Sequence, residues 1–573
     1  MAILLKPVDV AVIGLGGAGG VAVLPLALAG LKIAGIEAGT WLDPHSFRPD
    51  EINNNVRGWP DSVQKANREV PTVRNSVNGP VLPRAAVHAM MNAVGGSTLH
   101  YWAQSWRLNP WDFAARTRAV ARYGKSVIPV GSTLEDWPLT YEELEPFYDT
   151  VEHAIGVSGK AGNIRGKIDP LGNVYEGARG REYPMPPLRS TGFTELMRAA
   201  ATGLGWKPFR PPAAINSEEH DGRPGCVYHG YCSRGGCHVQ AKNSTAVTTI
   251  PAALKTKNLT VFDRAQVTRI GVDANGRATG VTYLRGGKEY FQPAATVLLG
   301  SYTYENTRLL LLSKSKAFPK GLSNNGGQVG RHYFGHWVAA GNGGVIALFP
   351  FDLNVWYGTP AQGMVLDDWA DDNYDHAGLG FIGGTNLHVY NEMHPIQAAG
   401  METFGEPAFG SRWKSFVHQN AGRWNTSHLQ TSTFPYEDNF LDLDDTVRDP
   451  LGDPVCRITS LPRENEGRAV DFAQRKMEQW YRAAGAIKVV RRPMNPPGVS
   501  THAYGGTRMG DNAETNVVNR WGFSHEVPNL GVLGASVMGT SGARNPTLTV
   551  QALAWRTAEH LAKNWKAIAS APS

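Results

Sequence analysis

The sequence predicts an α/β fold in which a Rossmann-type nucleotide-binding domain is interleaved with an α+β domain built on a large mixed or antiparallel sheet. Three observations lead to this prediction. A strand, a glycine-rich turn, a helix and a second strand follow one another within residues 9–37. Residues 334–457 are rich in aromatic side chains and in alternating patterns typical of strands. A chain of 573 residues is also longer than one simple core usually accommodates.

The composition is that of a globular protein. Hydrophobic residues make up 42% and charged residues 18% of the chain, which argues against extensive disorder. The net charge of +6 is small for this length, and the basic residues are scattered rather than grouped in blocks. The sequence therefore does not indicate a nucleic-acid partner. Three of the four cysteines fall within twelve residues, which is not the pattern of a disulfide framework.

The segment Val10–Leu31 carries no charge and is long enough to raise the alternative of a transmembrane helix. Its glycines cluster at the front, Pro25 interrupts it, and Lys32 and Glu37 follow, so a βαβ unit explains the segment better. Neither a basic leading region nor a small-residue cleavage site precedes it. We therefore expect no secretory signal on this chain.

The N-terminal unit has the order of a dinucleotide-binding motif. A strand at Asp9–Ile13 and a strand at Leu31–Ile36 flank the turn and its helix, and Glu37 ends the second strand. The turn glycines are Gly14, Gly16 and Gly19. Such glycines let backbone N–H groups approach a pyrophosphate, and the acid can accept a ribose hydroxyl, which favours FAD or NAD over NADP. We expect Pro25 to kink the helix or to cap a short first segment.

The middle of the chain alternates strand and helix patterns. Four strands are predicted at Leu259–Phe262, Gln266–Ile270, Gly280–Tyr283 and Ala295–Leu299. A helix through Arg308–Leu312 follows them. We expect residues 1–333 to belong mainly to the nucleotide-binding domain, with a cysteine-rich insertion at 220–245. Residues 334–495 would form most of a substrate-binding domain, and residues 496–573 would return to the first domain.

Two polar residues near the C-terminus stand out. His502 lies in the segment Thr501-His-Ala-Tyr-Gly-Gly-Thr-Arg-Met-Gly510, and Asn545 follows 43 positions later. Asn545 opens the last predicted helix, and Pro546 suits its first turn because the missing N–H is not needed there. Apolar residues recur at helical spacing beyond it and predict a buried face: Val550, Leu553, Ala554, Ala558 and Leu561.

Together these segments resemble the glucose–methanol–choline (GMC) oxidoreductase family over nearly the whole chain. The loop Gly95-Gly-Ser-Thr98 looks like the family's flavin-contacting loop, and Asp136–Tyr148 is similar to its characteristic helix entry. Val329–His336 and Asn529–Val537 fit later signatures. The resemblance implies the GMC fold, bound FAD and oxidation of an alcohol by hydride transfer to flavin N5.

Three features resemble the bacterial sugar-dehydrogenase branch, which includes gluconate 2-dehydrogenase, fructose dehydrogenase, FAD glucose dehydrogenase and glucoside 3-dehydrogenase catalytic subunits. Gly534 stands where many GMC members carry an aspartate, and the branch shares this departure. The cysteine cluster and the identity of Asn545 are the other two features.

The resemblance assigns roles to individual residues. His502 corresponds to the catalytic base and Asn545 to its hydrogen-bonding partner, and a neutral imidazole can accept a hydroxyl proton near neutral pH. A structural histidine is the alternative. The expected cofactor-binding residues are Gly14, Gly16, Gly19, Glu37, Gly95, Gly96, Ser97, His100, Val267, Ala535, Pro546 and Thr547. The last helix would direct its positive end at the flavin N1–C2=O edge, unless it is only structural.

His100 occupies a position where some relatives attach the flavin covalently through its 8α carbon. Covalent FAD through His100 is therefore one expectation. The alternative is that the string His100-Tyr101-Trp102 only packs over the isoalloxazine ring.

The clustered cysteines are spaced Cys226-x5-Cys232-x4-Cys237 and are interleaved with glycines. Such thiolates suit an iron–sulfur cluster, and three ligands fit the [3Fe-4S] type that the sugar-dehydrogenase branch uses. Structural cysteines are one alternative, and zinc held with His229 or His238 is another. The fourth cysteine, Cys456, lies in a predicted strand of the substrate domain.

The expected substrate is a small sugar, glycoside or sugar acid, with the hydroxyl position left open. Trp356, Trp413 and Trp424 are candidates for stacking on a sugar ring, with core packing as the alternative. Arg508 could pair with a sugar acid, but the family pattern favours a structural role.

The resemblance also implies partners. A small signal-carrying subunit and a cytochrome c-type subunit would hold the chain at the periplasmic face of the inner membrane, so membrane contact would come only through them. A cytoplasmic location is the alternative. Two rival functions remain: a soluble oxygen-using oxidase that lacks a cluster, and a non-catalytic flavin-binding subunit.

Overall fold

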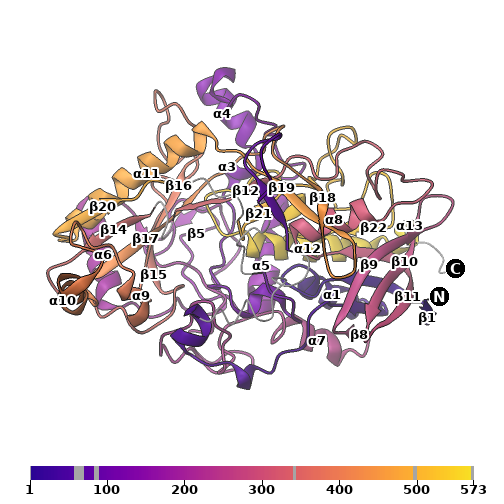
Figure 1. Cartoon of the computed structure of the whole chain (residues 1–573), viewed down its shortest axis with the longest axis horizontal. Coiled ribbons are helices and arrows are strands. Elements are labelled where there is room, and N and C mark those ends of the chain that lie inside the picture. Colours follow the sequence, from indigo (N-terminus) through magenta and orange to yellow (C-terminus); the bar gives the residue numbers. More distant parts are fainter. Residues whose placement is uncertain (1, 57–69, 83–89, 340–343, 495–499, 570–573) are drawn as a thin grey trace.

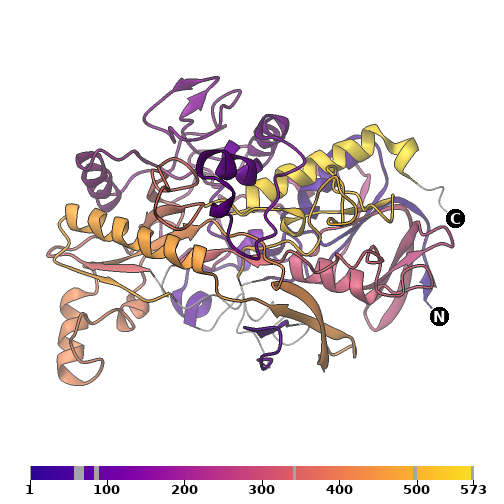
Figure 2. The same cartoon turned by 90° about the horizontal axis from the view of Figure 1, so that it is seen from above.

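The computed structural model of the chain contains two large sheets that lie at opposite ends of the molecule (Figure 1). It describes residues 2–56, 70–82, 90–339, 344–494 and 500–569. Both described chain ends lie beside the same sheet. Figure 2 shows helix α11 in orange at one end and helix α12 in yellow at the other. The prediction of a mixed α/β architecture with a Rossmann-type sheet and a second large sheet is confirmed.

The first sheet has eight strands in the order β8-β3-β2-β11-β10-β9, with β1 and β22 also paired to β11. Strands β8, β3, β2 and β11 are parallel, whereas β9 and β10 run antiparallel. The four predicted middle strands all form. The bounds are β1 Ile3–Leu4, β2 Val8–Ile13, β3 Ile33–Ile36, β8 Leu259–Phe262, β9 Ala265–Val272, β10 Ala278–Arg285, β11 Lys288–Leu299 and β22 Leu530–Val532.

Helices α1 (Gly19–Leu28), α5 (Tyr141–Ile155), α7 (Thr249–Lys255), α8 (Thr303–Leu312) and α12 (Thr547–Lys563) accompany this sheet. Helix α12 packs against both α1 and α5. Helix α1 continues through Pro25, so of the two expected effects the capping of a short first segment does not occur, and the kink stays a prediction. Pro25 lies in the second turn, where it lacks one backbone donor, and its ring is buried. Within the described residues, no helix has the length and apolar character needed to cross a membrane.

The second sheet has seven antiparallel strands in the order β20-β14-β17-β16-β15-β7, with β13 beside β17. Helices α6 (Gly192–Gly203) and α11 (Glu464–Ala483) pack on it. The bounds are β7 Pro208–Phe209, β13 Trp337–Ala339, β14 Val345–Leu348, β15 Gly363–Leu366, β16 Thr385–Tyr390, β17 Trp424–Thr431 and β20 Lys488–Arg491. The alternating patterns in residues 334–457 therefore contribute to a large sheet, as predicted.

Three smaller sheets complete the fold. Cys456 lies on a strand as predicted, but this strand pairs in a three-stranded sheet with an N-terminal strand, outside the seven-stranded sheet. The sequence could not show that pairing because its partner is far away in the chain. The bounds are β4 Thr72–Arg74, β18 Phe440–Arg448 and β19 Pro454–Thr459, then β5 Asn163–Ile164 with β6 Lys167–Ile168, and β12 Phe334–Gly335 with β21 Ala503–Tyr504.

The remaining described helices are short and lie mostly at the surface. They are α3 Pro110–Phe113, α4 Ala115–Tyr123, α9 Pro395–Ala399, α10 Gly410–Asn420 and α13 Trp565–Ile568, with a π-helical turn at Ile52–Val56 and 3₁₀ turns at Pro44–Ser46, Gly96–Leu99, Lys125–Val127 and Ala535–Val537.

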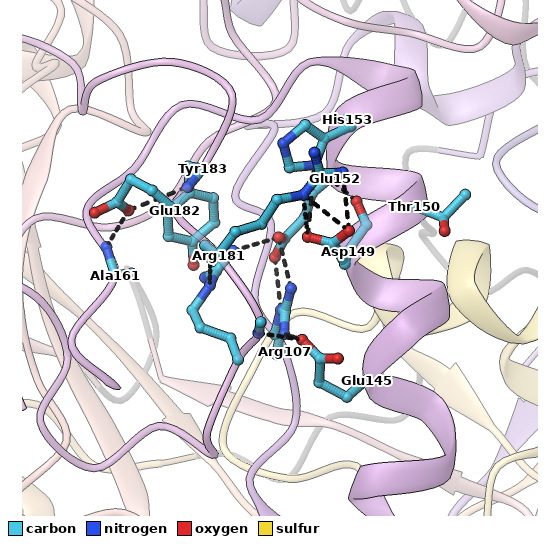
Figure 3. Close-up of polar contacts among 12 residues, drawn as sticks. Arg107, Glu145, Asp149, Thr150, Glu152, His153, Ala161, Arg181, Glu182 and Tyr183 are labelled. Carbon is cyan, nitrogen blue, oxygen red and sulfur yellow. Dashed lines mark hydrogen bonds and ion pairs between the residues drawn. The ribbon is translucent and has the colours of Figure 1, made fainter. Parts of the chain in front are cut away.

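Helix α5 is held by a network of buried ion pairs (Figure 3). Arg107 makes two parallel hydrogen bonds of 2.8 Å to Glu152, and a third of 2.9 Å to Glu145. Burial alone would raise the pKa of Glu152, but Arg107 and Arg179 outweigh it and lower that pKa. The network fixes the chain at Arg107, and therefore also the residue before it, Trp106.

Candidate active site

A cavity lies at the carboxyl ends of the parallel strands β2 and β3, the edge at which Rossmann-type sheets bind their ligands. Nine of the expected cofactor-binding residues line it: Gly14, Gly16, Glu37, Gly96, Ser97, Val267, Ala535, Pro546 and Thr547. Three others, Gly19, Gly95 and His100, are described residues that do not line it.

Two glycine loops form the floor of the cavity. Gly14 has a φ of +83°, and a side chain there would place its first carbon 2.7 Å from a backbone oxygen. Gly96 has a φ of +52°, and its added carbon would lie 2.8 Å from the α-carbon of Gly16. Gly19 packs against the turn itself. A side-chain carbon added at Gly19 would lie 1.9 Å from the backbone oxygen of Gly14. The loops thus present bare backbone to the cavity, as close approach of a pyrophosphate requires.

Glu37 lies at the end of β3, where it is 7% exposed and lines the cavity. Its two carboxylate oxygens accept backbone N–H groups from Leu15 and Gly39, both at 2.9 Å. Each carboxylate oxygen can accept more than one hydrogen bond, so a ribose hydroxyl can still donate to it. The glycine loops and Glu37 therefore fit the pyrophosphate and ribose of FAD.

The string His100-Tyr101-Trp102 divides between two environments. Tyr101 lines the cavity, and its hydroxyl donates to the backbone oxygen of Asn243 at 2.9 Å. Trp102 packs toward the second sheet, with its ring centre 5.1 Å from that of His428. His100 ends the 3₁₀ turn Gly96–Leu99 and is 5% exposed. Covalent attachment through His100 stays a prediction.

His502 and Asn545, expected from the sequence to act together, are brought together by the fold. His502 lines the cavity, and its Nε2 lies 3.3 Å from Asn545 Nδ2. The pairing of β21 with β12 fixes the chain after His502, and Pro546 is the N-cap residue of α12 directly after Asn545. Burial lowers the pKa of His502 to about 4. The imidazole is therefore neutral at physiological pH and able to accept a proton.

Two donors that the sequence did not reveal hold the Asn545 amide. Trp106 Nε1 and Gln430 Nε2 both donate to Asn545 Oδ1 at 2.8 Å. Gln430 comes from β17 of the second sheet, and Trp106 from the segment fixed by the Arg107 network. The amide is therefore held from the side of the second sheet, because Trp106 also packs on Phe209 and Val365 of that sheet.

The residue before Asn545 is also anchored. Arg544 is 1% exposed, and its guanidinium pairs with Asp371 at 2.8 Å and with Asp367. Buried arginine–carboxylate pairs of this kind fix geometry as well as charge. The sequence did not predict these ion pairs, because the residues around Arg544 do not indicate which distant carboxylates it pairs with.

A second histidine contacts His502. His336, the last residue of the segment Val329–His336, places its Nδ1 3.0 Å from His502 Nδ1. Further neutral polar side chains continue along the second sheet from Asn545. Gln430 Nε2 lies 3.3 Å from His428 Nδ1, and burial lowers the pKa of His428 well below its usual value. These imidazole and amide groups can both donate and accept hydrogen bonds.

The tryptophans and the arginine considered for sugar binding lie elsewhere. Trp424 is 4% exposed and packs in the core of the second sheet, with Trp356 partly buried against the same cluster. Trp413 lies on helix α10, which has no buried residues. Among the described residues, these tryptophans and Arg508 are not part of the cavity lining. Arg508 pairs with Glu135 at 3.0 Å, consistent with a structural role.

The cysteine loop holds three free, partly buried thiols at Cys226, Cys232 and Cys237. Burial raises the pKa of Cys226 to about 11 and raises that of Cys232 well above its usual value, and the neighbouring thiols add to both shifts. The rings of His229 and His238 stack with centres 5.2 Å apart. In the part of the chain that the structure describes, no three His, Cys, Asp or Glu side chains are arranged to hold a metal ion. The thiols are neighbours, but their arrangement does not fit a cluster.

Known proteins resemble this chain in sequence and fold. A family profile for GMC oxidoreductases matches residues 435–554. The gluconate 2-dehydrogenase flavoprotein of Pantoea cypripedii is 32% identical, over 98% of this chain and 94% of that protein. The fructose dehydrogenase large subunit of Gluconobacter japonicus is 26% identical, over 83% of this chain and 81% of that protein. The solved structure of pyridoxine 4-oxidase from Mesorbium loti aligns with a TM-score of 0.62 at 17% identity, over 96% of this chain and 99% of that chain, which shows a shared fold.

Proposed function

Because the chain belongs to the GMC oxidoreductase family of FAD-dependent enzymes that act on CH–OH donors, we propose that it is a dehydrogenase that oxidises a hydroxyl of a sugar, glycoside or sugar acid. One observation carries the proposal. His502 Nε2 and Asn545 Nδ2 lie 3.3 Å apart beside the cavity that the glycine loops and Glu37 line.

The two side chains divide the work on the substrate hydroxyl. His502 Nε2 accepts its proton, while Asn545 Nδ2 donates a hydrogen bond to its oxygen. Their separation lets one hydroxyl reach both atoms. Bound FAD supplies the acceptor for the hydride that leaves the same carbon. The N-terminus of α12, whose Pro546 and Thr547 line the cavity, contributes partial positive charge there.

Two observations support a polyhydroxylated substrate. The buried side chains beside Asn545 are the neutral amides and imidazoles of Gln430, His428 and His388 on the second sheet and of Gln104, which contacts His388; they lie outside the cavity lining. Groups of this kind match hydroxyls, which also donate and accept. Relatives named for gluconate and fructose oxidation point to the same chemical class.

A test of the reaction is the bleaching of bound flavin by candidate sugars, glycosides and sugar acids without oxygen. Wild-type protein should bleach with at least one of them. His502→Ala should keep its flavin and lose about 100-fold or more in bleaching rate, the range of a positioned general base. His418→Ala, on the exposed helix α10, is the matched control. Full bleaching by His502→Ala would refute the role of His502.

The electron acceptor is a separate part of the proposal. We propose that electrons pass to a cytochrome or quinone, and that Cys226, Cys232 and Cys237 would hold a [3Fe-4S] cluster on the way in an arrangement of their loop that differs from the described one. A small signal-carrying subunit and a cytochrome c-type subunit would then place the enzyme at the periplasmic face of the inner membrane. The cysteine spacing and the naming of one relative as a large subunit support this proposal.

An oxygen-using oxidase without a cluster is the second candidate, since another relative, of Streptomyces fradiae, is named paromamine 6'-oxidase. Iron and acid-labile sulfide per flavin distinguish the two. About three irons per flavin, lost in Cys232→Ser and kept in Cys456→Ser, would support the dehydrogenase. Absence of iron from freshly purified protein, with rapid reoxidation of the flavin by oxygen, would support the oxidase.

A further inference from the structure

We propose that His336 is a positioning residue that fixes which nitrogen of His502 carries the proton. The inference deepens the proposed function and rests on it, because it concerns the same base. It follows from a chain of hydrogen bonds in which each donor or acceptor is decided by the one before.

The chain begins at Trp106, whose indole nitrogen can only donate a hydrogen bond. It lies 2.8 Å from one side-chain atom of Asn545, so that atom must be the carbonyl oxygen Oδ1. Gln430 reaches the same oxygen at 2.8 Å. The remaining atom of the amide is Nδ2, which can only donate, and it faces His502 at 3.3 Å.

The tautomer of His502 follows from this orientation. An amide donor facing Nε2 requires an unprotonated Nε2, so a neutral His502 carries its single proton on Nδ1. That arrangement keeps Nε2 unprotonated, and a substrate hydroxyl would replace the Asn545 N–H at its single lone pair. The opposite tautomer would present an N–H to both Asn545 and the substrate, and it could not act as a base.

His336 provides the partner that this tautomer needs. Its Nδ1 lies 3.0 Å from His502 Nδ1, so His336 must accept there and carry its own proton on Nε2. The strand pair β12–β21 and a backbone hydrogen bond of 2.9 Å from His336 N–H to the oxygen of His502 hold the rings together. Burial, with His502 and His428 nearby, lowers the pKa of His336 well below its usual value, which keeps this acceptor neutral.

Two substitutions separate positioning from packing. His336→Leu fills a similar volume but offers no acceptor, whereas His336→Asn can place its carbonyl oxygen where Nδ1 lies. We expect His336→Leu to slow flavin reduction about 10- to 100-fold at saturating substrate, the range that one buried hydrogen bond can account for. FAD content and the substrate concentration for half-maximal rate should stay within about threefold of wild type. His336→Asn should recover most of the rate.

A spectroscopic readout tests the tautomer directly. In protein labelled with ¹⁵N in histidine, the signals lost in His502→Ala identify His502, and we expect a protonated Nδ1 in wild type and a mixture of tautomers in His336→Leu. Tyr504→Phe is the control: its ring packs 6.0 Å from that of His336, and its hydroxyl has no hydrogen-bond partner among the described residues.

The outcomes are distinguishable from failure of the proposed function. Flavin reduction in His336→Leu at the wild-type rate, a His336→Asn variant as slow as His336→Leu, or a wild-type His502 protonated on Nε2 would each overturn the inference. If His502→Ala itself reduced flavin normally, the proposed function would fail instead.

Discussion

Replacing Arg544 with methionine should destabilise the fold and impair the neighbouring Asn545. Arg544 pairs with Asp371 at 2.8 Å and with Asp367, and these three side chains are at most 1% exposed. Methionine keeps the apolar stem of the side chain but removes the charge. These two carboxylates, and that of Asp112 at 4.0 Å from the same guanidinium, would then remain buried without their cation.

The size of the effect follows from what remains around those carboxylates. Removing one partner of a buried ion pair usually costs about 3–5 kcal/mol. Asparagine side chains also donate to the two aspartates at 2.7 Å and would still stabilise them: Asn109, Asn173 and Asn386. We therefore expect a loss of about 3 kcal/mol in the free energy of unfolding, at the lower end of that range.

Urea unfolding followed by tryptophan fluorescence measures this loss. Arg412→Met is the matched control, because Arg412 pairs with Glu406 while its side chain is 73% exposed, and its loss should stay below about 0.5 kcal/mol. Adding Asp367→Asn and Asp371→Asn to Arg544→Met should restore most of the stability. A loss below about 1 kcal/mol, or no recovery in the triple variant, would refute the reasoning.

Three further predictions concern pH and the cofactor loop. Because burial lowers the pKa of His502 to about 4, the rate of flavin reduction should stay level above pH ~5 and fall only below it; an acid limb near pH 6.5 would contradict this. Burial raises the pKa of Glu466 to about 7 from an ordinary value of 4.5. The protonated Glu466 side chain therefore contributes its full share of stability below pH 4.5, and this contribution is lost as the pH rises to about 7. In urea unfolding, Glu466→Gln should therefore be more stable than wild type by roughly 1–3 kcal/mol at pH ~8 and equal to it at pH ~4.5. The same difference in stability at both pH values would count against burial as the cause. Gly96→Ala, whose added carbon would lie 2.8 Å from Gly16, should lower flavin absorbance per protein, whereas Gly192→Ala, whose added carbon would have no neighbour within 4 Å among the described residues, should not. Full flavin content in Gly96→Ala would show that the loop can adjust.

The parts of the fold that depend on neighbouring residues could be predicted from the sequence. The strands around Gly14 and the strand Leu259–Phe262 form where their patterns indicate, because hydrophobic periodicity and glycine turns act within short segments. The place of Cys456 could not be predicted in the same way. Its strand pairs with Thr72–Arg74, almost four hundred residues away, and nothing in either segment identifies the other.

The same division holds at the candidate active site. His502 and Asn545 were found through motifs shared with a family, and the structure brings them within 3.3 Å of each other. The side chains that orient them were missed: the contacts of Trp106 and Gln430 with Asn545 span 439 and 115 residues, and that of His336 with His502 spans 166. A hydrogen bond between residues so far apart in the sequence depends on the final packing, and no local sequence pattern predicts it.

The orientation of His502 therefore depends on how the second sheet and the segment packed on it hold Asn545. Asn545 Oδ1 accepts one hydrogen bond from Trp106, which the ion pairs on α5 hold in place, and one from Gln430 on the second sheet. If either bond were lost, the amide could rotate. Nδ2 would then no longer require an unprotonated Nε2 on His502. Substitutions that remove the hydrogen bond from Trp106 or Gln430 should consequently slow the chemistry before they release the cofactor, because the residues that fit FAD lie mainly on the first sheet and the loops and helices beside it.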